Sequence, residues 1–457
     1  MENELTLDAT IQTIIELLEA KKYSRARDEI LKNNSVDIAE ILEEVREELG
    51  LEKTIILFRT LTKDVSAEVF SYLPTDDQVD IISGITDREI THIIDELSFD
   101  DMIDVLEELP ANIVDKILEK TTKEERRLIN TFLNYPETSA GSLMTPDYIS
   151  LRKNMTVAEA LAYIKKEGMD SETVYTCYIK DEGRKLLGIV SLRTLVVSDD
   201  QVRLEELMHE DIIYVNVLDD QEDVSDAFKK YGFLAIPVVD NEHRLVGIIT
   251  VDDILDVIDE ETTEDFQRMA GVAASTEEYL DMSVWKHVKN RLPWLFVLMC
   301  SYVITGGIIS SFEAVLSKVI VLVTYMPMLM GTGGNSGSQS ATLVIRGLAL
   351  GDVDTGDVLK VLWKELRVSF LIGVVLSALN FARIYWMDGQ SALVALTVCG
   401  SMLFIVIAAK TIGSMLPMAA KKVGIDPALM ASPMIASLTD MVSVVTYFTL
   451  ATVILGI

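Results

Sequence analysis

One acidic residue, Asp440, stands inside the otherwise uncharged run SPMIASLTDMVSVVTYF. A carboxylate at the centre of a membrane costs about 2.5–3.5 kcal/mol, so such a residue normally faces water, an ion or a polar partner. Mg²⁺ and Ca²⁺ prefer oxygen ligands, and Mg²⁺ gives up its waters reluctantly. Asp440 therefore predicts a path for a hard cation. The competing interpretation is an Asp that packs against a neighbouring hydroxyl.

A second polar stretch, MLMGTGGNSGSQSATLVIRG, lies at 328–347. Its glycines either break a helix or let backbones approach closely, and irregular backbone at membrane depth must be buried or line water. A small-residue packing face is the alternative for this stretch taken alone. Pro433, seven residues before Asp440, is expected to free carbonyls one turn back. Together these features predict half of an ion path.

Other kinds of chemistry find little support. The cysteines Cys177, Cys300 and Cys399 have no metal or disulfide spacing, and without a Cys/His cluster zinc and copper are disfavoured. No phosphate-binding loop, nucleophile elbow or histidine metal motif is found, so an enzyme is not expected. Lys410 is expected to snorkel toward the cytoplasmic end of its span.

Five apolar segments are long enough to carry these groups through a bilayer. Basic residues gather before the first, between the second and third, and between the fourth and fifth, which places those loops in the cytoplasm and the C-terminus outside. No signal peptide is expected at the N-terminus, which should stay cytoplasmic. The predicted spans are Leu292–Phe312, Val319–Leu343, Val368–Trp386, Ala392–Leu416 and Met430–Ile454.

The charge of the chain is concentrated ahead of these spans. From Leu292 onward nine basic and eight acidic residues leave a net charge of +1, so the preceding part carries −33 of the chain's net charge of −32. Such an acidic front repels nucleic acid and anionic lipid and attracts cations. We therefore expect divalent cations and a membrane, and no nucleic acid, as partners.

Residues 1–135 predict an all-α, solenoid-like N domain. Five pairs of an apolar residue and a helix-start residue follow one another at 12-residue steps, from Leu61-Thr62 to Leu109-Pro110. Twelve residues hold one short helix and its turn, and stacked units of this kind bury their faces on one another.

Residues 136–258 contain two similar α/β segments, about 136–200 and 201–258, in which LLGIVSL and LVGIITV stand 59 residues apart. They resemble a tandem pair of CBS modules, which often sense a ligand. The resemblance implies that Thr250 and Asp253 suit a nucleotide ribose, whereas Ser191 is followed by Thr194 instead of Asp. ATP is thus a candidate ligand of one unit only. Residues 259–285 are predicted to be an acidic connecting helix.

The runs PMLMGTGGNSGSQSATLVIRGLALGD, DPALMASP and SLTD resemble the signature of the MgtE family of magnesium channels. The resemblance covers nearly the whole chain. It implies a multidomain fold: N domain, CBS pair, connecting plug helix and a five-helix transmembrane bundle (286–457). It also implies a homodimer in the cell membrane with a pore between subunits. Ser338 and Lys410 depart from the family pattern. The implied pore residues are Asp440, Ala436, Gly331, Gly334, Asn335, Thr342 and Asp426.

The resemblance further implies that cytosolic Mg²⁺ closes the pore by binding between the soluble domains. Close carboxylates repel one another without ions, and Mg²⁺ that prefers the compact state shifts the population toward it. A cation-coupled carrier using Lys410 and Asp440 is the alternative, and a nucleotide-reading signalling protein ranks last. The acids expected to hold regulatory Mg²⁺ are Asp100, Asp104, Asp220, Glu222, Asp253, Asp256, Glu261, Glu264 and Asp265.

Overall fold

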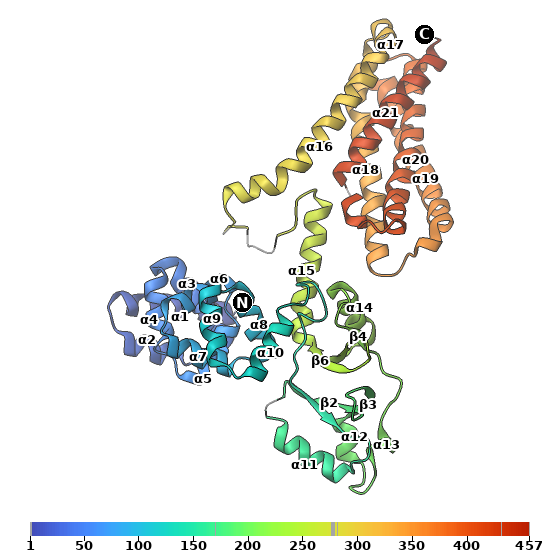
Figure 1. Ribbon diagram of the computed structural model, residues 1–457. Helices are drawn as coiled ribbons and strands as arrows, with labels where there is room; N and C mark the ends of the chain where they lie inside the picture. Colours follow the sequence, from blue (N-terminus) through green and yellow to red (C-terminus); the bar gives the residue numbers. More distant parts are fainter. Residues whose placement is uncertain (1, 170, 276–278, 281, 431, 457) are drawn as a thin grey trace. The chain divides into compact units, whose positions relative to one another are not determined.

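The computed structural model describes residues 2–169, 171–275, 279–280, 282–430 and 432–456. The chain forms two compact units, Met1–Ile258 and Asp259–Ile457 (Figure 1). The first unit contains the helical N domain and the α/β segments, and the second contains the long apolar helices.

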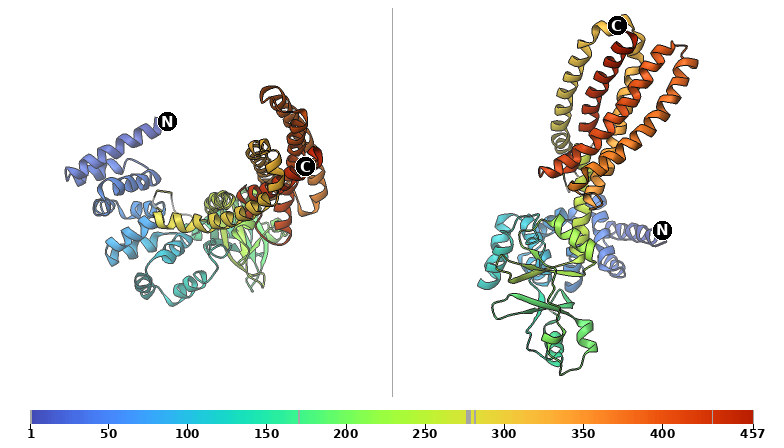
Figure 2. Two further views of the ribbon diagram at one scale, coloured as in Figure 1. Left: turned by 90° about the horizontal axis from the view of Figure 1, so that it is seen from above. Right: turned by 90° about the vertical axis from the view of Figure 1, so that its right-hand side faces the viewer.

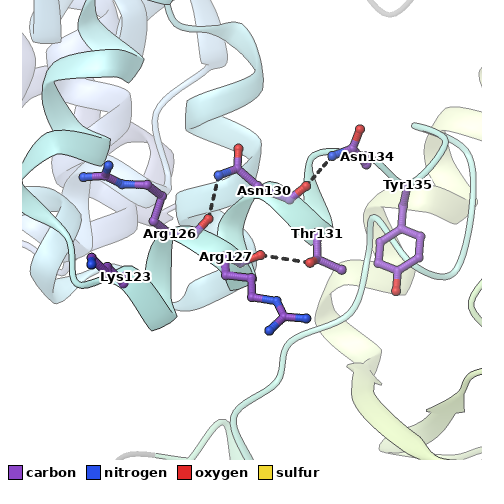
Figure 3. Close-up of a pocket in the computed structure, with 7 residues that line it drawn as sticks. All are labelled: Lys123, Arg126, Arg127, Asn130, Thr131, Asn134 and Tyr135. Carbon is purple, nitrogen blue, oxygen red and sulfur yellow. Dashed lines mark hydrogen bonds between the residues drawn. The ribbon is translucent and has the colours of Figure 1, made fainter.

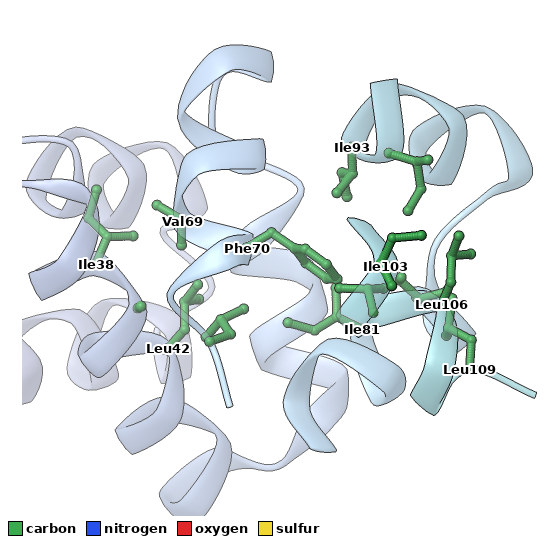
Figure 4. Close-up of a cluster of buried hydrophobic side chains, with 14 of the residues drawn as sticks. Ile38, Leu42, Val69, Phe70, Ile81, Ile93, Ile103, Leu106 and Leu109 are labelled. Atoms are coloured by element: carbon green, nitrogen blue, oxygen red, sulfur yellow. The ribbon is translucent and has the colours of Figure 1, made fainter. Parts of the chain in front are cut away.

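The N domain is all-helical. It opens with α1 (Glu2–Glu19), α2 (Tyr23–Ile30), α3 (Ser35–Leu49) and α4 (Leu51–Phe58), followed by α5 (Lys63–Ser71), α6 (Thr75–Gly84), α7 (Asp87–Glu96), α8 (Phe99–Glu108), α9 (Ala111–Lys120) and α10 (Lys123–Phe132). Figure 4 shows Phe70 of α5, Ile81 of α6 and Ile103 of α8 packed in one apolar cluster. Each short helix thus buries its apolar face on its neighbours.

The predicted 12-residue repeat is confirmed. Helices α5 to α10 begin at residues 63, 75, 87, 99, 111 and 123. The predicted helix-start residues are the N-caps, and Thr86 and Thr122 form capping boxes in which each hydroxyl accepts from a backbone N–H three residues later. The helix starts therefore recur every twelve residues, and side-chain capping hydrogen bonds stabilise those at Thr86, Ser98 and Thr122.

Two three-stranded sheets with the same topology follow. The first has β1 (Tyr148–Leu151), β2 (Thr173–Lys180) and β3 (Leu186–Ser191), with α11 (Val157–Glu167), α12 (Leu192–Val197) and α13 (Leu204–Leu207); the second has β4 (Val215–Asn216), β5 (Ala235–Val239) and β6 (Leu245–Thr250), with α14 (Gln221–Tyr231). In both sheets the first pair of strands is parallel and the second antiparallel. The predicted internal repeat is confirmed.

The two sheets exchange short segments. Thr145, which precedes β1, forms two backbone hydrogen bonds with Ile248 of β6, and His209, which precedes β4, does the same with Ile189 of β3. A Cβ on Gly247 would lie 2.8 Å from the sulfur of Met144, and one on Gly188 would lie 2.9 Å from that of Met208. Each sheet is therefore completed by residues that lead into the other.

Helix α15 (Val251–Met269) follows β6 without a break. It covers the end of the second α/β segment and the first part of the predicted 259–285 helix. After Met269 the chain leaves the helix, and the next one begins only at Val284. The connecting helix is thus an extension of the α/β segment that ends earlier than predicted; residues 276–278 and 281 lie outside the described residues.

The second unit consists of long helices that run side by side (Figures 1 and 2). They are α16 (Val284–Ser311), α18 (Val321–Ala349), α19 (Val358–Ala382), α20 (Ala392–Lys422) and α21 (Ser432–Leu455), with the short α17 (Glu313–Lys318). Among the described residues, four helical segments are long and apolar enough to cross a membrane. They contain α16, α19 with its π-helical extension, α20 and α21. Helix α18 is long enough, but its Gly, Ser, Asn and Gln residues lower its hydropathy, so five spans remain a prediction.

Helix α18 is continuous through the glycine-rich stretch. The expectation that the glycines break it is wrong, because packing against α20 and α21 stabilises the helix despite its poor propensity. The alternative of close approach holds instead. A Cβ on Gly413 of α20 would lie 2.1 Å from the carbonyl oxygen of Gly337, and one on Gly333 would lie 2.7 Å from Ser443 Oγ. Glycine is required at Gly413, where the backbones of α18 and α20 touch, and Gly333 leaves room for the Ser443 side chain.

Candidate functional site

Three of the predicted pore residues share one face of α18. Gly331, Asn335 and Thr342 are four and seven residues apart and are all exposed in the single chain, as helical spacing requires. We call this the α18 polar face. A row of polar exposed positions on a membrane helix needs water or another chain beside it.

Asp440 and Ala436 lie on α21, one turn apart. A methyl group on Gly334 would be 3.6 Å from the Cβ of Ala436, so α18 and α21 touch at this level. Asp440 is half-buried, and its carboxylate has no hydrogen-bond or ion-pair partner among the described residues of the chain. The alternative of a packing Asp bonded to a hydroxyl therefore finds no support within one protomer.

The carbonyls near Asp440 differ from the expectation. Pro433 is the second residue of α21, where its missing N–H leaves no helical hydrogen bond unmade, so it frees no carbonyl within the helix. The carbonyl of Ala436 also accepts a hydrogen bond from Thr439 Oγ1 at 3.0 Å. Ser338, one of the departures from the family pattern, donates to the carbonyl of Ser432 at 3.5 Å.

Lys410 does not snorkel to the surface. Its side chain is 4 % exposed, and its Nζ donates to Ser340 Oγ of α18 at 3.1 Å. Ser340 in turn donates to Glu365 Oε2 of α19 at 2.7 Å. The expectation of snorkelling is wrong because the Ser340 hydroxyl of α18 offers Lys410 a polar partner inside the helix bundle.

Asp426 precedes α21 and forms an ion pair with the connecting helix. Arg268 Nη1 of α15 lies 2.6 Å from Asp426 Oδ2, and Arg268 also pairs with Glu264. Asp426 Oδ1 accepts from the backbone N–H of Ala428 at 2.7 Å. Met269 packs beside Ala341 and Ile435. The end of α15 is thus fixed to the helices that carry the predicted pore residues.

A cluster of carboxylates joins the N domain to the α/β segments within the first unit. Partial burial, then the charges of Asp100 and Asp252, raise the pKa of Asp253 to about 8, although Thr250 donates a hydrogen bond to it. Desolvation followed by the charges of Asp100 and Asp252 raises the pKa of Glu172 to about 7. We call this group the acidic cluster; its members are Asp100, Asp101, Asp147, Glu172, Asp252 and Asp253.

The acidic cluster has the character of a cation site that is short of positive charge. Burial also raises the pKa of Asp100, and one oxygen of that side chain is buried without a hydrogen-bond partner. Among the described residues no three His, Cys, Asp or Glu side chains are placed to hold a metal ion directly. Carboxylates around a hydrated Mg²⁺ need not reach direct-ligand distance, so these residues fit Mg²⁺ that keeps its waters.

The remaining predicted regulatory acids do not all converge on the cluster. Asp220 caps α14 by accepting from the N–H of Glu222 at 3.0 Å, and both side chains are exposed. Asp104 and Asp256 are exposed one turn beyond Asp100 and Asp253. Glu261 and Asp265 are half-buried on α15 near the Glu264–Arg268 pair. The structure therefore brings together Asp100 and Asp253 and places the others elsewhere.

Four members of the acidic cluster, Asp101, Asp252, Asp147 and Glu172, are not among the residues predicted from the sequence. The first two are direct neighbours of predicted residues, so the doublets DD at 100–101 and 252–253 were the available signal. Asp147 and Glu172 lie in the first α/β segment, and no local pattern ties them to α8. The link from Ser340 to Glu365 is not among these predictions either.

The candidate nucleotide residues are present but differ between the two segments. In the second, Thr250 Oγ1 donates to Asp253 Oδ2 at 2.8 Å, and in the first the hydroxyls of Ser191 and Thr194 are 2.8 Å apart. Asp253 therefore belongs both to the predicted ribose position and to the acidic cluster.

One cavity, of about 700 Å³, is basic. It follows one face of α10 and its end, and Figure 3 shows Arg126, Arg127 and Asn130 along it. Its positive lining repels cations, so it is separate in character from the acidic cluster.

Membrane-length apolar helices, the polar face of α18 and the Asp440 carboxylate of α21, which has no partner among the described residues, are the features of an integral membrane protein that handles charged solutes. Three family models match parts of this chain. They are the MgtE divalent cation transporter (326–450), the MgtE intracellular N domain (33–138) and the CBS domain (140–198 and 204–260).

Full-length relatives agree with these matches. The chain is 36% identical over 453 residues to the magnesium transporter MgtE of Thermus thermophilus, covering 96% of this chain and 99% of the relative, and 31% identical to that of Bacillus subtilis, covering 99% of both. A crystal structure of the cytosolic domain of the Mg²⁺ channel MgtE in complex with ATP is 35% identical and covers 53% of this chain and 99% of that one, with a TM-score of 0.49. The chain belongs to the MgtE family.

Proposed function

We propose that this protein is a Mg²⁺-selective channel of the cell membrane that imports Mg²⁺ and is closed by Mg²⁺ bound to its cytosolic domains. Its relatives named as magnesium transporters align with nearly its whole length. The observation that carries the proposal is the unpaired Asp440 beside Ala436, next to the α18 polar face. A carboxylate and oxygen-bearing side chains suit a cation that keeps part of its water.

The same face supports the proposal of a homodimer. Asn335 and Thr342 are exposed in one chain, and such polar side chains are costly toward lipid. A two-fold copy would cover them and place two Asp440 carboxylates across one path. In this arrangement the N-terminal domains are cytoplasmic and the C-terminus lies outside.

The acidic cluster supports closure by Mg²⁺. Its carboxylates come from the N domain and both α/β segments, and burial followed by the charges of neighbouring carboxylates raises the pKa values of Glu172 and Asp253. Mg²⁺ between them favours the compact arrangement, and its loss favours separation. ATP is proposed only for the second CBS segment, where the Thr250–Asp253 pair is present, and it would share Asp253 with the cluster.

Asp440→Ala tests the pathway. We expect Mg²⁺ flux into proteoliposomes to be abolished while crosslinking still reports the dimer. Thr452→Ala, which removes a half-buried hydroxyl of the same helix that donates to the backbone carbonyl of Phe448, should retain flux. Normal flux through the Asp440 variant would refute the pathway assignment.

The sensor is tested by neutralising Asp100 and Asp253 together. The double Asn variant should stay conductive in inside-out patches at millimolar Mg²⁺ on the cytoplasmic face. Glu96→Gln, an exposed acid of α7, is the matched control and should close normally. Closure of the double variant at the wild-type Mg²⁺ concentration would contradict the sensor.

The second candidate is a cation-coupled carrier for divalent metals. The buried Lys410 favours it, because a charged side chain inside a membrane domain is typical of coupled transport. Steep dependence of uptake on a proton or sodium gradient would support the carrier, whereas unitary current steps would support the channel.

A further inference from the structure

Lys410 carries a buried charge that the ion pathway does not explain. It is the only lysine or arginine among the fully buried side chains of the described residues. Its ammonium is bridged to the Glu365 carboxylate by the hydroxyl of Ser340, with donor–acceptor distances of 3.1 and 2.7 Å. The Ser340 hydroxyl thus links α18 to both α20 and α19. It connects the positive charge of Lys410 with the negative charge of Glu365.

This charge relay lies close to the candidate pathway. Ser340 is three residues beyond Gly337 on α18, about 4.5 Å along the helix axis. A Cβ on Gly337 would lie 3.1 Å from the carbonyl oxygen of Ala409, next to Lys410, and 3.1 Å from Thr439, next to Asp440. Ala409 and Thr439 thus both lie against Gly337 of α18, and each directly precedes one of the two charged residues, Lys410 and Asp440.

An unpaired ammonium at this place would act on the ion. Electrostatic interactions are strong in a medium of low dielectric, and their energy scales with the charge of the ion. A divalent cation would therefore be repelled about twice as strongly as a monovalent one. Glu365 supplies the opposite charge, and the Ser340 hydroxyl, which is hydrogen-bonded to both side chains, holds the two charged groups in place.

We propose, on the basis of the proposed function, that Lys410 and Glu365, coupled through Ser340, form a charge pair behind α18 that sets the affinity of the pathway for divalent cations. Neither residue contacts the ion. They are positioning residues that set the potential at Asp440 and at the α18 polar face.

A purely structural pair makes a different prediction. Removing either member of a buried pair leaves an uncompensated charge and destabilises the protein, so a structural role gives loss of folded protein in both single variants, with no opposite effects on ion affinity. The electrostatic role gives opposite signs: loss of Glu365 weakens Mg²⁺ binding, and loss of Lys410 strengthens it.

The experiment measures the half-saturating external Mg²⁺ concentration for flux in proteoliposomes of the full-length protein. Glu365→Gln should raise it by about tenfold and affect a monovalent current less. Lys410→Met should lower it, and the double variant should return near the wild-type value. Lys360→Met, which removes one member of the exposed Lys360–Asp357 pair, is the matched control and should leave it unchanged.

Two conservative variants keep the test decisive if a charge-removing variant fails to fold. Glu365→Asp retains the charge and should keep half-saturation close to wild type, and Ser340→Ala retains both charges and should shift it less than Glu365→Gln. Shifts of the same sign in Glu365→Gln and Lys410→Met would overturn the inference, as would an equal shift in Ser340→Ala and Glu365→Gln. Absence of Mg²⁺ flux in the wild type would instead refute the proposed function.

Discussion

Asp253 shows how one residue is placed under competing demands. It accepts a hydrogen bond from Thr250, which favours its ionised form, yet burial and three nearby carboxylates raise its pKa to about 8. In an unfolded chain an Asp titrates near 3.9. Between these values the folded state binds more protons than the unfolded state, so the free energy of unfolding falls as the pH rises through this window.

Asp253→Asn should therefore stabilise the full-length protein when divalent cations are absent. The gain in Tm over wild type should be small at pH 5 and reach a few degrees at pH 8, because only the ionised Asp is repelled. Thermal unfolding in detergent with a chelator measures it. Adding Mg²⁺ should stabilise the wild type more than the variant, and a Tm difference that is constant with pH would contradict the role of charge.

Among the helices, α18 and α20 meet through backbone atoms. Gly413→Ala places a methyl group 2.1 Å from the Gly337 carbonyl, which forces the helices apart. Mg²⁺ flux should fall at least tenfold, since Gly337 also touches α21 beside Asp440. Gly400→Ala on the same helix meets nothing within 4 Å and should keep its flux. Equal flux in both variants would show that the close approach is dispensable.

The N-cap residues of the short helices contribute unequally to the stability of the N domain. Thr122→Ala removes a capping box and should lower the free energy of unfolding by about 1 kcal/mol. Thr62 occupies the equivalent N-cap without a side-chain hydrogen bond, so Thr62→Ala should cost clearly less. Denaturant unfolding monitored by circular dichroism compares the two, and equal losses would argue against the cap as the cause.

Local signals explain which elements were predictable. The 12-residue period is visible in the helix-start residues that directly precede each helix, and the 59-residue repeat in two strands with the same apolar pattern. The course of α18 was not predictable, because its glycines disfavour a helix alone and only contacts with α20 and α21 decide the outcome. The acidic cluster and the burial of Lys410 likewise depend on residues far apart in the sequence.

At the scale of the whole molecule, Arg268 ties the connecting helix to the membrane unit through Asp426 and Glu264. Under the proposed function this ion pair holds the closed state. Arg268→Ala should leave Mg²⁺ currents at cytoplasmic concentrations that silence the wild type, because it removes a contact that, under the proposed function, stabilises the closed state. Inside-out patch recording measures the shift in the closing concentration.

The control for this variant is Arg244→Ala. Arg244 pairs with Asp240 and Glu242 in an exposed turn of the first unit. It should close like the wild type. An unchanged closing concentration in Arg268→Ala would show that the Asp426 contact does not contribute to closure.

The exchange of residues between the two sheets has a consequence for how the protein is made. Each half leaves the ribosome without the methionine–glycine contact that completes it, since Met144 needs Gly247 and Gly188 needs Met208. The first sheet can therefore form its backbone hydrogen bonds with His209 only after residue 209 has emerged. Thr145 can pair with Ile248 only after residue 248 has been synthesised. A nascent chain arrested shortly after residue 200 should be sensitive to protease in both places, and synthesis of the last strand should protect them together.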